Sequence, residues 1–218
     1  MFSGGNRQLA GRCCPVAGLT RSWRWLAAAL FFAGVWPAAG QGDASLEVGT
    51  AGHGEPQLVF LSEPAAPRDA WDHVVARFEV AYRCHVFAPL MDGDFQRQAG
   101  TVIDYVREQG LVRPVLVGHG PGGAVAIEVA LQAPELPGRL VLVDCLPDPA
   151  DDLGKIRCPT LVLGALAGPY AVTRRVFRRQ YRGLPGVRFR FFARVGHFLM
   201  VDDLDGFTDA LRRELIGR

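Results

Sequence analysis

Short apolar runs alternate with segments of helical periodicity along most of the chain, as expected for a protein built from strands and helices in turn. The apolar runs predict strands, after a weak first one near Leu46 and Val48, at residues 57–61, 84–90, 115–119, 140–144, 160–163 and 187–192. The periodic segments predict helices at residues 69–82, 95–110, 172–181 and 203–216, and another between the two central strands. Strands that alternate with helices favour a doubly wound α/β fold with a mostly parallel sheet.

The most informative stretch is the central strand–helix–strand unit, residues 115–144. Its two strands are apolar almost throughout, which is typical of parallel strands buried on both faces. The turn between the first strand and the helix reads Gly118-His119-Gly120-Pro121-Gly122. This turn has the glycine spacing of a nucleophile elbow, G-x-S-x-G, with Gly120 at the position of the serine.

The first 40 residues differ from the rest of the chain. They hold four arginines and no acidic residue, followed by an apolar run at residues 25–36 and small residues before Gln41. This pattern predicts a secretory signal peptide over residues 1–40, cleaved before Gln41, and therefore an exported protein that is periplasmic or secreted. The alternative is a membrane anchor, but a spanning helix needs about 20 apolar residues. We therefore expect no stable membrane span after cleavage and one domain over residues 41–218.

Composition narrows the range of partners. The mature chain keeps 20 of the 24 basic residues against 22 acidic ones, a formal net charge of −2, so we expect no nucleic-acid partner. The arginine-rich helix at residues 172–181 is interpreted as a solvated face. Three cysteines remain, Cys84, Cys145 and Cys158, which allow at most one internal disulfide of undetermined pairing. The spacing of cysteine and histidine suggests no metal site, and no cofactor is expected.

Four segments in order resemble the α/β-hydrolase family. They are residues 71–90, the strand and elbow at residues 115–123, the strand at 159–164, and Gly196-His197-Phe198 with the acidic helix that follows. The resemblance implies a doubly wound, mostly parallel sheet of the α/β-hydrolase type, in a minimal version without a cap domain. The connection between Cys145 and Cys158 is too short to contain a cap domain, so any pocket near His197 is expected to be open.

The resemblance also implies that the usual acyl-transfer chemistry is lost. In the family, an elbow serine attacks a carbonyl group and a histidine takes its proton, but Gly120 has no side-chain oxygen. One oxyanion-hole donor is the backbone N–H after the nucleophile, and Pro121 has none. The other donor comes from a His-Gly pair whose place is taken by Ser62-Glu63. Removing one such donor costs about 2.7–4 kcal/mol of barrier height.

The remaining members of the triad are only partly present. His197 stands at the catalytic histidine, but residues 165–169 carry no carboxylate where the family usually has its acid. Asp144, at the end of the preceding strand, is the substitute, and the alternative is that it merely closes that strand. Ser45, Ser62 and Cys145 are poor replacements for the nucleophile because none has an evident base. His119 is expected to pack beside the sheet.

These observations predict an exported protein that resembles ester and acyl hydrolases, lacks serine-hydrolase activity, and binds a small apolar or ester-like ligand or a partner. One alternative is an enzyme that uses His197 with an unconventional partner, so enzymatic activity stays open. A second alternative is dinucleotide binding, because Gly118, Gly120 and Gly123 satisfy G-x-G-x-x-G and Asp144 follows about 20 residues later.

Overall fold

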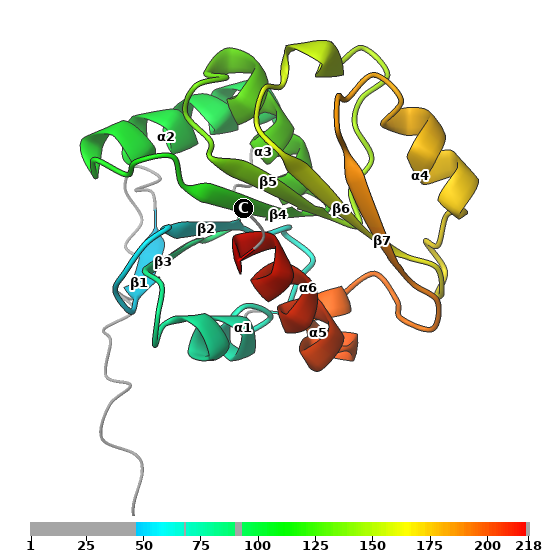
Figure 1. The fold of residues 1–218 in the computed structure, drawn as a ribbon, viewed down its shortest axis with the longest axis horizontal. Helices are drawn as coiled ribbons and strands as arrows, with labels where there is room; N and C mark the ends of the chain where they lie inside the picture. The colour runs from blue at the N-terminus through cyan, green and yellow to red at the C-terminus, as the bar shows by residue number, and fades with distance from the viewer. Residues whose placement is uncertain (1–46, 68, 90–92, 217–218) are drawn as a thin grey trace, which may run out of the picture. The chain divides into compact units, whose positions relative to one another are not determined.

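The structure, a computed structural model, describes residues 47–67, 69–89 and 93–216 of the 218-residue chain. The predicted signal peptide and the boundary after residue 40 lie outside the described residues. A seven-stranded sheet forms the centre, in the order β1-β3-β2-β4-β5-β6-β7 (Figure 1). The strands are β1 (Val48–Ala51), β2 (Leu58–Leu61), β3 (Cys84–Phe87), β4 (Val115–His119), β5 (Arg139–Val143), β6 (Thr160–Ala165) and β7 (Arg188–Phe192).

The strand directions confirm the predicted sheet. Only β1, at one edge, runs antiparallel to its neighbour β3, and the other paired strands are parallel. The helices are α1 (Asp72–Phe78), α2 (Phe95–Glu108), α3 (Pro121–Gln132), α4 (Arg174–Gln180), α5 (Leu199–Asp202) and α6 (Leu204–Ile216), with a 3₁₀ turn, η1 (Leu153–Lys155). Among the described residues, none of the helices is both long enough and apolar enough to cross a membrane.

Helices cover both faces of the sheet, as the alternation of elements predicts. Helices α2, α3 and α4 pack on one face and α1, α5 and α6 on the other (Figure 1). Each face of the sheet packs against its helices in a separate hydrophobic core, and alternate residues of the central strands point into one core or the other. Leu116 faces α2 and α3, while Val115 and Val117 face α1 and α6. Burial on both faces explains why these strands are apolar at almost every position.

The helix predicted at residues 69–82 is shorter than its periodicity indicates. Its buried face includes Trp71, Val74 and Phe78, as predicted, but Ala81 lies beyond the end of α1 and is exposed. The backbone that follows α1 packs instead against the residues directly after β1. A Cβ at Gly52 would lie 2.4 Å from the carbonyl oxygen of Glu79, so the two backbones are in close contact there. Tertiary packing therefore ends the helix earlier than the sequence pattern does.

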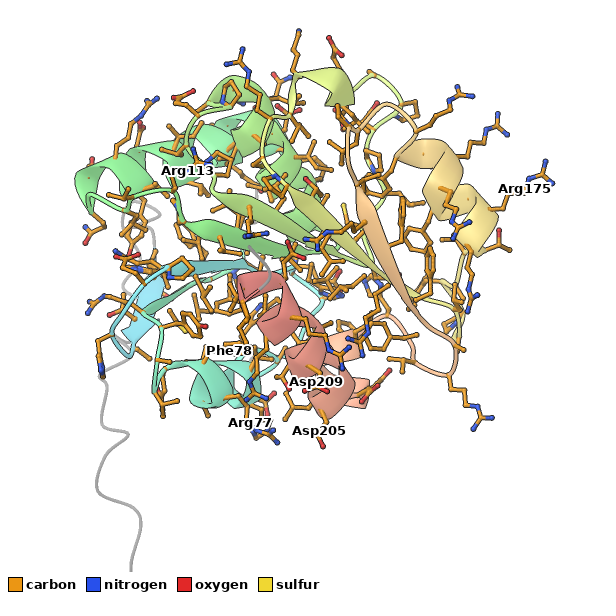
Figure 2. All side chains as sticks on the ribbon, in the orientation of Figure 1. Arg77, Phe78, Arg113, Arg175, Asp205 and Asp209 are labelled. Carbon is orange, nitrogen blue, oxygen red and sulfur yellow. The ribbon has the colours of Figure 1, made fainter. Side chains whose placement is uncertain are left out.

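Two ion-pair sites join the closing helix α6 to the rest of the fold. Arg77 of α1 lies 3.0 Å from Asp205 of α6, and Figure 2 shows this pair at the outer surface, where such pairs contribute little. Glu214 differs because its carboxylate is buried and accepts hydrogen bonds from Arg139 and Arg188, at the starts of β5 and β7. This buried carboxylate anchors the last turns of α6 to the amino ends of the sheet.

The glycines of the central turn are required by close backbone contacts. A Cβ at Gly118 would lie 2.4 Å from the carbonyl oxygen of Gly122, and one at Gly122 would lie 2.2 Å from that of Leu61. A Cβ at Gly123 would lie 2.6 Å from the Cβ of Cys145. Helix α3 can therefore approach β2, β4 and the end of β5 only because these positions lack side chains.

We predict that Gly122→Ala lowers the free energy of unfolding by about 2 kcal/mol or more, because the added methyl group collides with backbone. Gly100→Ala is the matched control, since Gly100 lies inside α2 with open space around its Cβ position. This control should be stabilised by about 0.5–1 kcal/mol. Urea denaturation of both variants measures the difference, and equal stabilities would contradict the packing described for the turn.

Candidate functional site

The candidate site lies at the carboxyl ends of four parallel strands. Glu63 follows β2, Gly120 follows β4, Asp144 follows β5, and His197 lies in the loop after β7. Parallel strands present their carboxyl ends at the same edge of the sheet, which is where α/β proteins place their binding sites. Residues separated by more than 130 positions in the sequence are thus brought into one cluster.

Asp144 and His197 form the pair that the sequence predicts. Asp144 Oδ2 lies 2.6 Å from His197 Nδ1, and the other carboxylate oxygen accepts a hydrogen bond of 2.9 Å from the backbone N–H of Ala165. Asp144 adopts a φ of 43°, a left-handed conformation that is uncommon for residues other than glycine. The carboxylate thus bridges the end of β5 to the end of β6 and orients the imidazole ring.

The other nitrogen of the His197 ring contacts a residue whose role the sequence did not reveal. Glu63 Oε2 lies 2.9 Å from His197 Nε2, and the Glu63 side chain is buried. A Cβ built at Gly120 would lie only 2.2 Å from this same oxygen and 3.5 Å from His197 Nε2. The carboxylate of Glu63 therefore occupies the space that a serine side chain at position 120 would need.

The strand register explains how Glu63 reaches this position. Leu61 of β2 pairs with Gly118 of β4, so Glu63 and Gly120 each lie two residues beyond a matched pair. Gly120 has a φ of 51°, which glycine adopts without the steric cost that a side chain would add. From the sequence, Glu63 was predicted to lie only in the oxyanion region. Its neighbour across the sheet, Gly120, was the signal that could have identified it.

The two carboxylates change the acid–base properties of His197. The hydrogen bond to Asp144 raises the pKa of His197 to about 9; burial opposes this rise, and the hydrogen bond to Glu63 adds to it. Only the doubly protonated ring can donate to both carboxylates at once. His197 therefore lies between two acceptors as an imidazolium ion at neutral pH, and in that form it cannot take a proton from a nucleophile.

His119 completes the cluster. The ring is fully buried, and because a backbone carbonyl can only accept, its Nε2 donates the 2.9 Å hydrogen bond to the carbonyl oxygen of His197. Its Nδ1 has no hydrogen-bond partner among the described residues and lies 3.9 Å from Glu63 Oε2. Burial lowers the pKa of His119, with the Glu63 charge opposing. The packing role predicted for His119 describes its burial but not this inward-facing nitrogen.

Glu63, His119 and His197 together could hold a metal ion. Each offers one ligand atom, and the three atoms lie within 4.8 Å of one another. The spacing of histidines and cysteines in the sequence predicted no metal site. Such spacing marks ligands that are close in sequence, whereas here three separate strand ends each contribute a residue.

The remaining residues of the predicted site lie nearby but supply no chemistry to His197. Pro121 is the first residue of α3 and has no N–H to donate. Ser62 lines a small crevice with Phe87 and Gln98 and makes no side-chain hydrogen bond among the described residues. Cys145 is buried, and burial raises the pKa of its thiol to about 12, so it is a poor nucleophile, as predicted. Cys84 and Cys158 are also buried free thiols.

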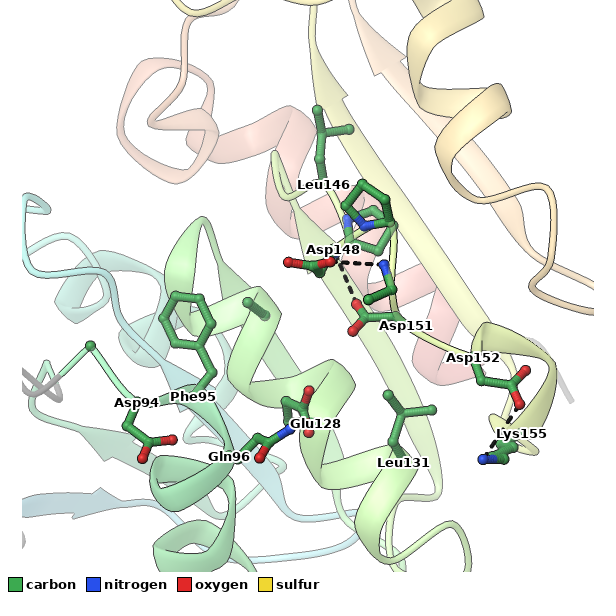
Figure 3. Close-up of a pocket in the computed structure, with 15 residues that line it drawn as sticks. Asp94, Phe95, Gln96, Glu128, Leu131, Leu146, Asp148, Asp151, Asp152 and Lys155 are labelled. Atoms are coloured by element: carbon green, nitrogen blue, oxygen red, sulfur yellow. Dashed lines mark hydrogen bonds and ion pairs between the residues drawn. The ribbon is translucent and has the colours of Figure 1, made fainter.

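At the elbow itself, the carboxylate of Glu63 fills the space beside Gly120. A cavity of about 970 Å³ lies elsewhere, between the start of α2, the outer side of α3 and the loop after β5 (Figure 3). Its lining does not include His197, and it combines apolar side chains with several carboxylates: Phe95, Glu128, Leu146, Asp148, Asp151 and Asp152. The cavity is therefore separate from the histidine cluster.

Comparison with known proteins identifies the fold. The chain superposes on an α/β-hydrolase enzyme from a metagenome of lagoon sediments at Mar Chica, Morocco, with a TM-score of 0.69 and 18% identity, covering 80% of this chain and 96% of that one. The enol-lactonase of Burkholderia xenovorans gives 0.67 with 15% identity, covering 78% and 96%, and an esterase of Exiguobacterium antarcticum gives 0.66 with 15% identity, covering 78% and 94%.

Sequence comparison gives a shorter match. A Haemophilus influenzae protein described as an esterase/lipase is 33% identical over 61 residues, which is 28% of this chain and only 21% of that protein. No protein-family model matches the chain. The structural likeness and the sheet topology together show that the protein has the α/β-hydrolase fold. Within that fold, the carboxylate of Glu63, from the loop after β2, contacts His197 beside Gly120.

We predict that the His197 ring titrates near pH 9 and that Asp144→Asn lowers its pKa, because the hydrogen bond to Asp144 is the main cause of the rise. The folded-state pKa lies above the ordinary 6.5, so the protonated ring stabilises the fold fully below pH 6.5 and this contribution is lost as the pH rises through about 9. NMR titration of the ring in buffer with EDTA measures the pKa. A ring that titrates near 6.5 would contradict the two-carboxylate arrangement.

Proposed function

We propose that this chain is an exported α/β-hydrolase-fold protein that does not act as a serine hydrolase, and that its former nucleophile site is a binding site. One observation carries the proposal. The carboxylate of Glu63 lies where the serine side chain would stand and is hydrogen-bonded to the histidine that would activate it. A serine mechanism needs this histidine free to accept a proton from the hydroxyl group.

Three further features support the loss of acyl transfer. Gly120 offers no oxygen, Pro121 offers no N–H to an oxyanion, and the carboxylate of Glu63 would repel the negative charge that develops there. These changes affect the nucleophile, the oxyanion hole and the base separately. Reversing one of them alone therefore leaves the mechanism incomplete.

The site also disfavours dinucleotide binding. In that class of protein, a pyrophosphate group binds at the N-terminus of the helix after the glycine-rich turn. Here the buried carboxylate of Glu63 lies against Gly120 at the N-terminus of α3, and it would repel a phosphate. Close packing, against the backbone of Gly122 and the side chain of Cys145, explains Gly118 and Gly123 without any nucleotide.

The retained Asp144–His197 pair supports a binding role for the site. The pair keeps a 2.6 Å contact, and Asp144 holds a left-handed backbone conformation that residues other than glycine adopt uncommonly. Strained backbone of this kind persists where the surrounding structure enforces it, and it is concentrated at functional sites. A buried arrangement of two carboxylates and two histidines suits a small polar ligand better than the apolar, ester-like one predicted from the resemblance.

We predict that the wild-type protein is not labelled by a fluorophosphonate probe, because no activated hydroxyl is present. The variant Gly120→Ser should also stay unlabelled, since Glu63 fills the space of the new side chain. The triple variant Glu63→Gly, Gly120→Ser, Pro121→Ala removes the carboxylate and restores both a hydroxyl and a backbone donor. It should react measurably faster than the single variant. Stoichiometric labelling of the wild-type protein would overturn the proposal.

We further predict that the mature protein begins at Gln41. The small residues before this position fit the cleavage pattern of a signal peptide. Expression of the full chain in a bacterial host, followed by fractionation and N-terminal sequencing of the soluble exported pool, measures the cleavage position. Recovery of the intact chain in the cytoplasm would contradict export.

A further inference from the structure

The strongest unexplained feature of the structure is the inward-facing nitrogen of His119. Buried polar atoms nearly always have a hydrogen-bond partner, so an unpartnered one calls for an explanation. His119 Nδ1 is fully buried and unpartnered, and it lies 3.9 Å from Glu63 Oε2. Because Nε2 donates to the carbonyl oxygen of His197, the neutral ring presents a lone pair at Nδ1.

We propose that Glu63 Oε2, His119 Nδ1 and His197 Nε2 form a binding site for a divalent transition-metal ion, with Zn²⁺ as the best fit. Two imidazole nitrogens and one carboxylate oxygen are a ligand set that Zn²⁺ takes in catalytic sites, with a fourth position left for water or substrate. The same set with more open positions suits Fe²⁺.

The distances suit a single ion. Ligands about 2.0–2.1 Å from a tetrahedral Zn²⁺ ion lie about 3.3–3.4 Å from one another. Glu63 Oε2 is 2.9 Å from His197 Nε2 and 3.9 Å from His119 Nδ1, and no pair of the three atoms exceeds 4.8 Å. Rotation about the three side-chain bonds of Glu63 can adjust its distances to both histidines toward this value.

Both histidines already have the outer partners that metal-binding histidines use. A ligating imidazole usually donates its other N–H to a carboxylate or a backbone carbonyl, which fixes the tautomer and directs the lone pair at the metal. His197 Nδ1 contacts Asp144 Oδ2 at 2.6 Å, and His119 Nε2 contacts the carbonyl oxygen of His197 at 2.9 Å. Asp144 is itself held by the N–H of Ala165.

Gly120 makes room for this arrangement. Any side chain at this position would collide with Glu63 Oε2, so the carboxylate can enter the cluster only beside glycine. Access is from the side of His197, whose side chain is 21% exposed, whereas the side chains of Glu63 and His119 are 6% and 0% exposed. A metal ion would take the place of the proton on His197 Nε2 that faces Glu63, so metal binding releases that proton.

Calorimetric titration of the metal-stripped, purified protein with Zn²⁺ tests the proposal, with visible absorption of the Co²⁺ form as a second readout. The expected result is one ion per chain at micromolar affinity or tighter. Glu63→Gln and His119→Asn should each weaken binding at least tenfold and change the Co²⁺ spectrum. Asp144→Asn, which acts through His197, should weaken it about 10–100-fold.

His85→Asn is the matched control. His85 is also buried, but its two ring nitrogens contact Tyr105 and Gln57, so this variant should bind Zn²⁺ as the wild type does. Circular dichroism checks that each variant is folded, and His119→Gln replaces His119→Asn if the latter is not. Absence of binding, or binding that Glu63→Gln leaves unchanged, would overturn the proposal. Fluorophosphonate labelling is independent of this result, so the two proposals can fail separately.

Discussion

The hydrogen bond between Glu63 and His197 determines the character of this site. A histidine that is held by Asp144 on one side would normally present its second nitrogen to a nucleophile. Here that nitrogen meets a buried carboxylate instead, at 2.9 Å. The contact occupies the nitrogen that a nucleophile would need and at the same time assembles a compact set of oxygen and nitrogen donors.

Each of the other unusual features of the turn is consistent with this contact. Glu63 needs the space beside Gly120, and a glycine there carries the positive φ of the elbow easily. Pro121 suits the first turn of α3, where its missing N–H costs nothing. Gly122 and Gly123 keep α3 close to β2 and to Cys145. At this turn, the carboxylate of Glu63 therefore lies in the space that a side chain at position 120 would need.

The sequence predicted the fold well because its strongest signals are local. Runs such as β4 and β5 are apolar on both faces, and the helices between them show a regular period, so the parallel sheet follows from pattern alone. Element ends were less certain: α1 stops at Phe78, because backbone contacts between Gly52 and Glu79 are not visible in a helical pattern. The Asp144–His197 pair was predictable because the family resemblance places the end of β5 and the loop after β7 side by side.

The role of Glu63 was not predictable in the same way. The residues next to Glu63 in the sequence indicate neither a ligand nor a histidine partner. The one signal, Gly120, meets Glu63 only through the register of β2 against β4. His119 presented a similar difficulty, because burial of its ring was evident from the strand pattern but the direction of its Nδ1 was not. A site that takes single residues from separate strands has no characteristic spacing of those residues along the sequence.

A double-mutant cycle between Glu63 and His197 tests the central contact most directly. Urea denaturation at neutral pH, with EDTA present, would compare the wild type with Glu63→Gln, His197→Gln and the double variant. We expect a coupling free energy of about 1 kcal/mol or more, since residues in one hydrogen-bonded pair do not contribute independently. Single-variant effects that sum to that of the double variant within about 0.3–0.5 kcal/mol would contradict it.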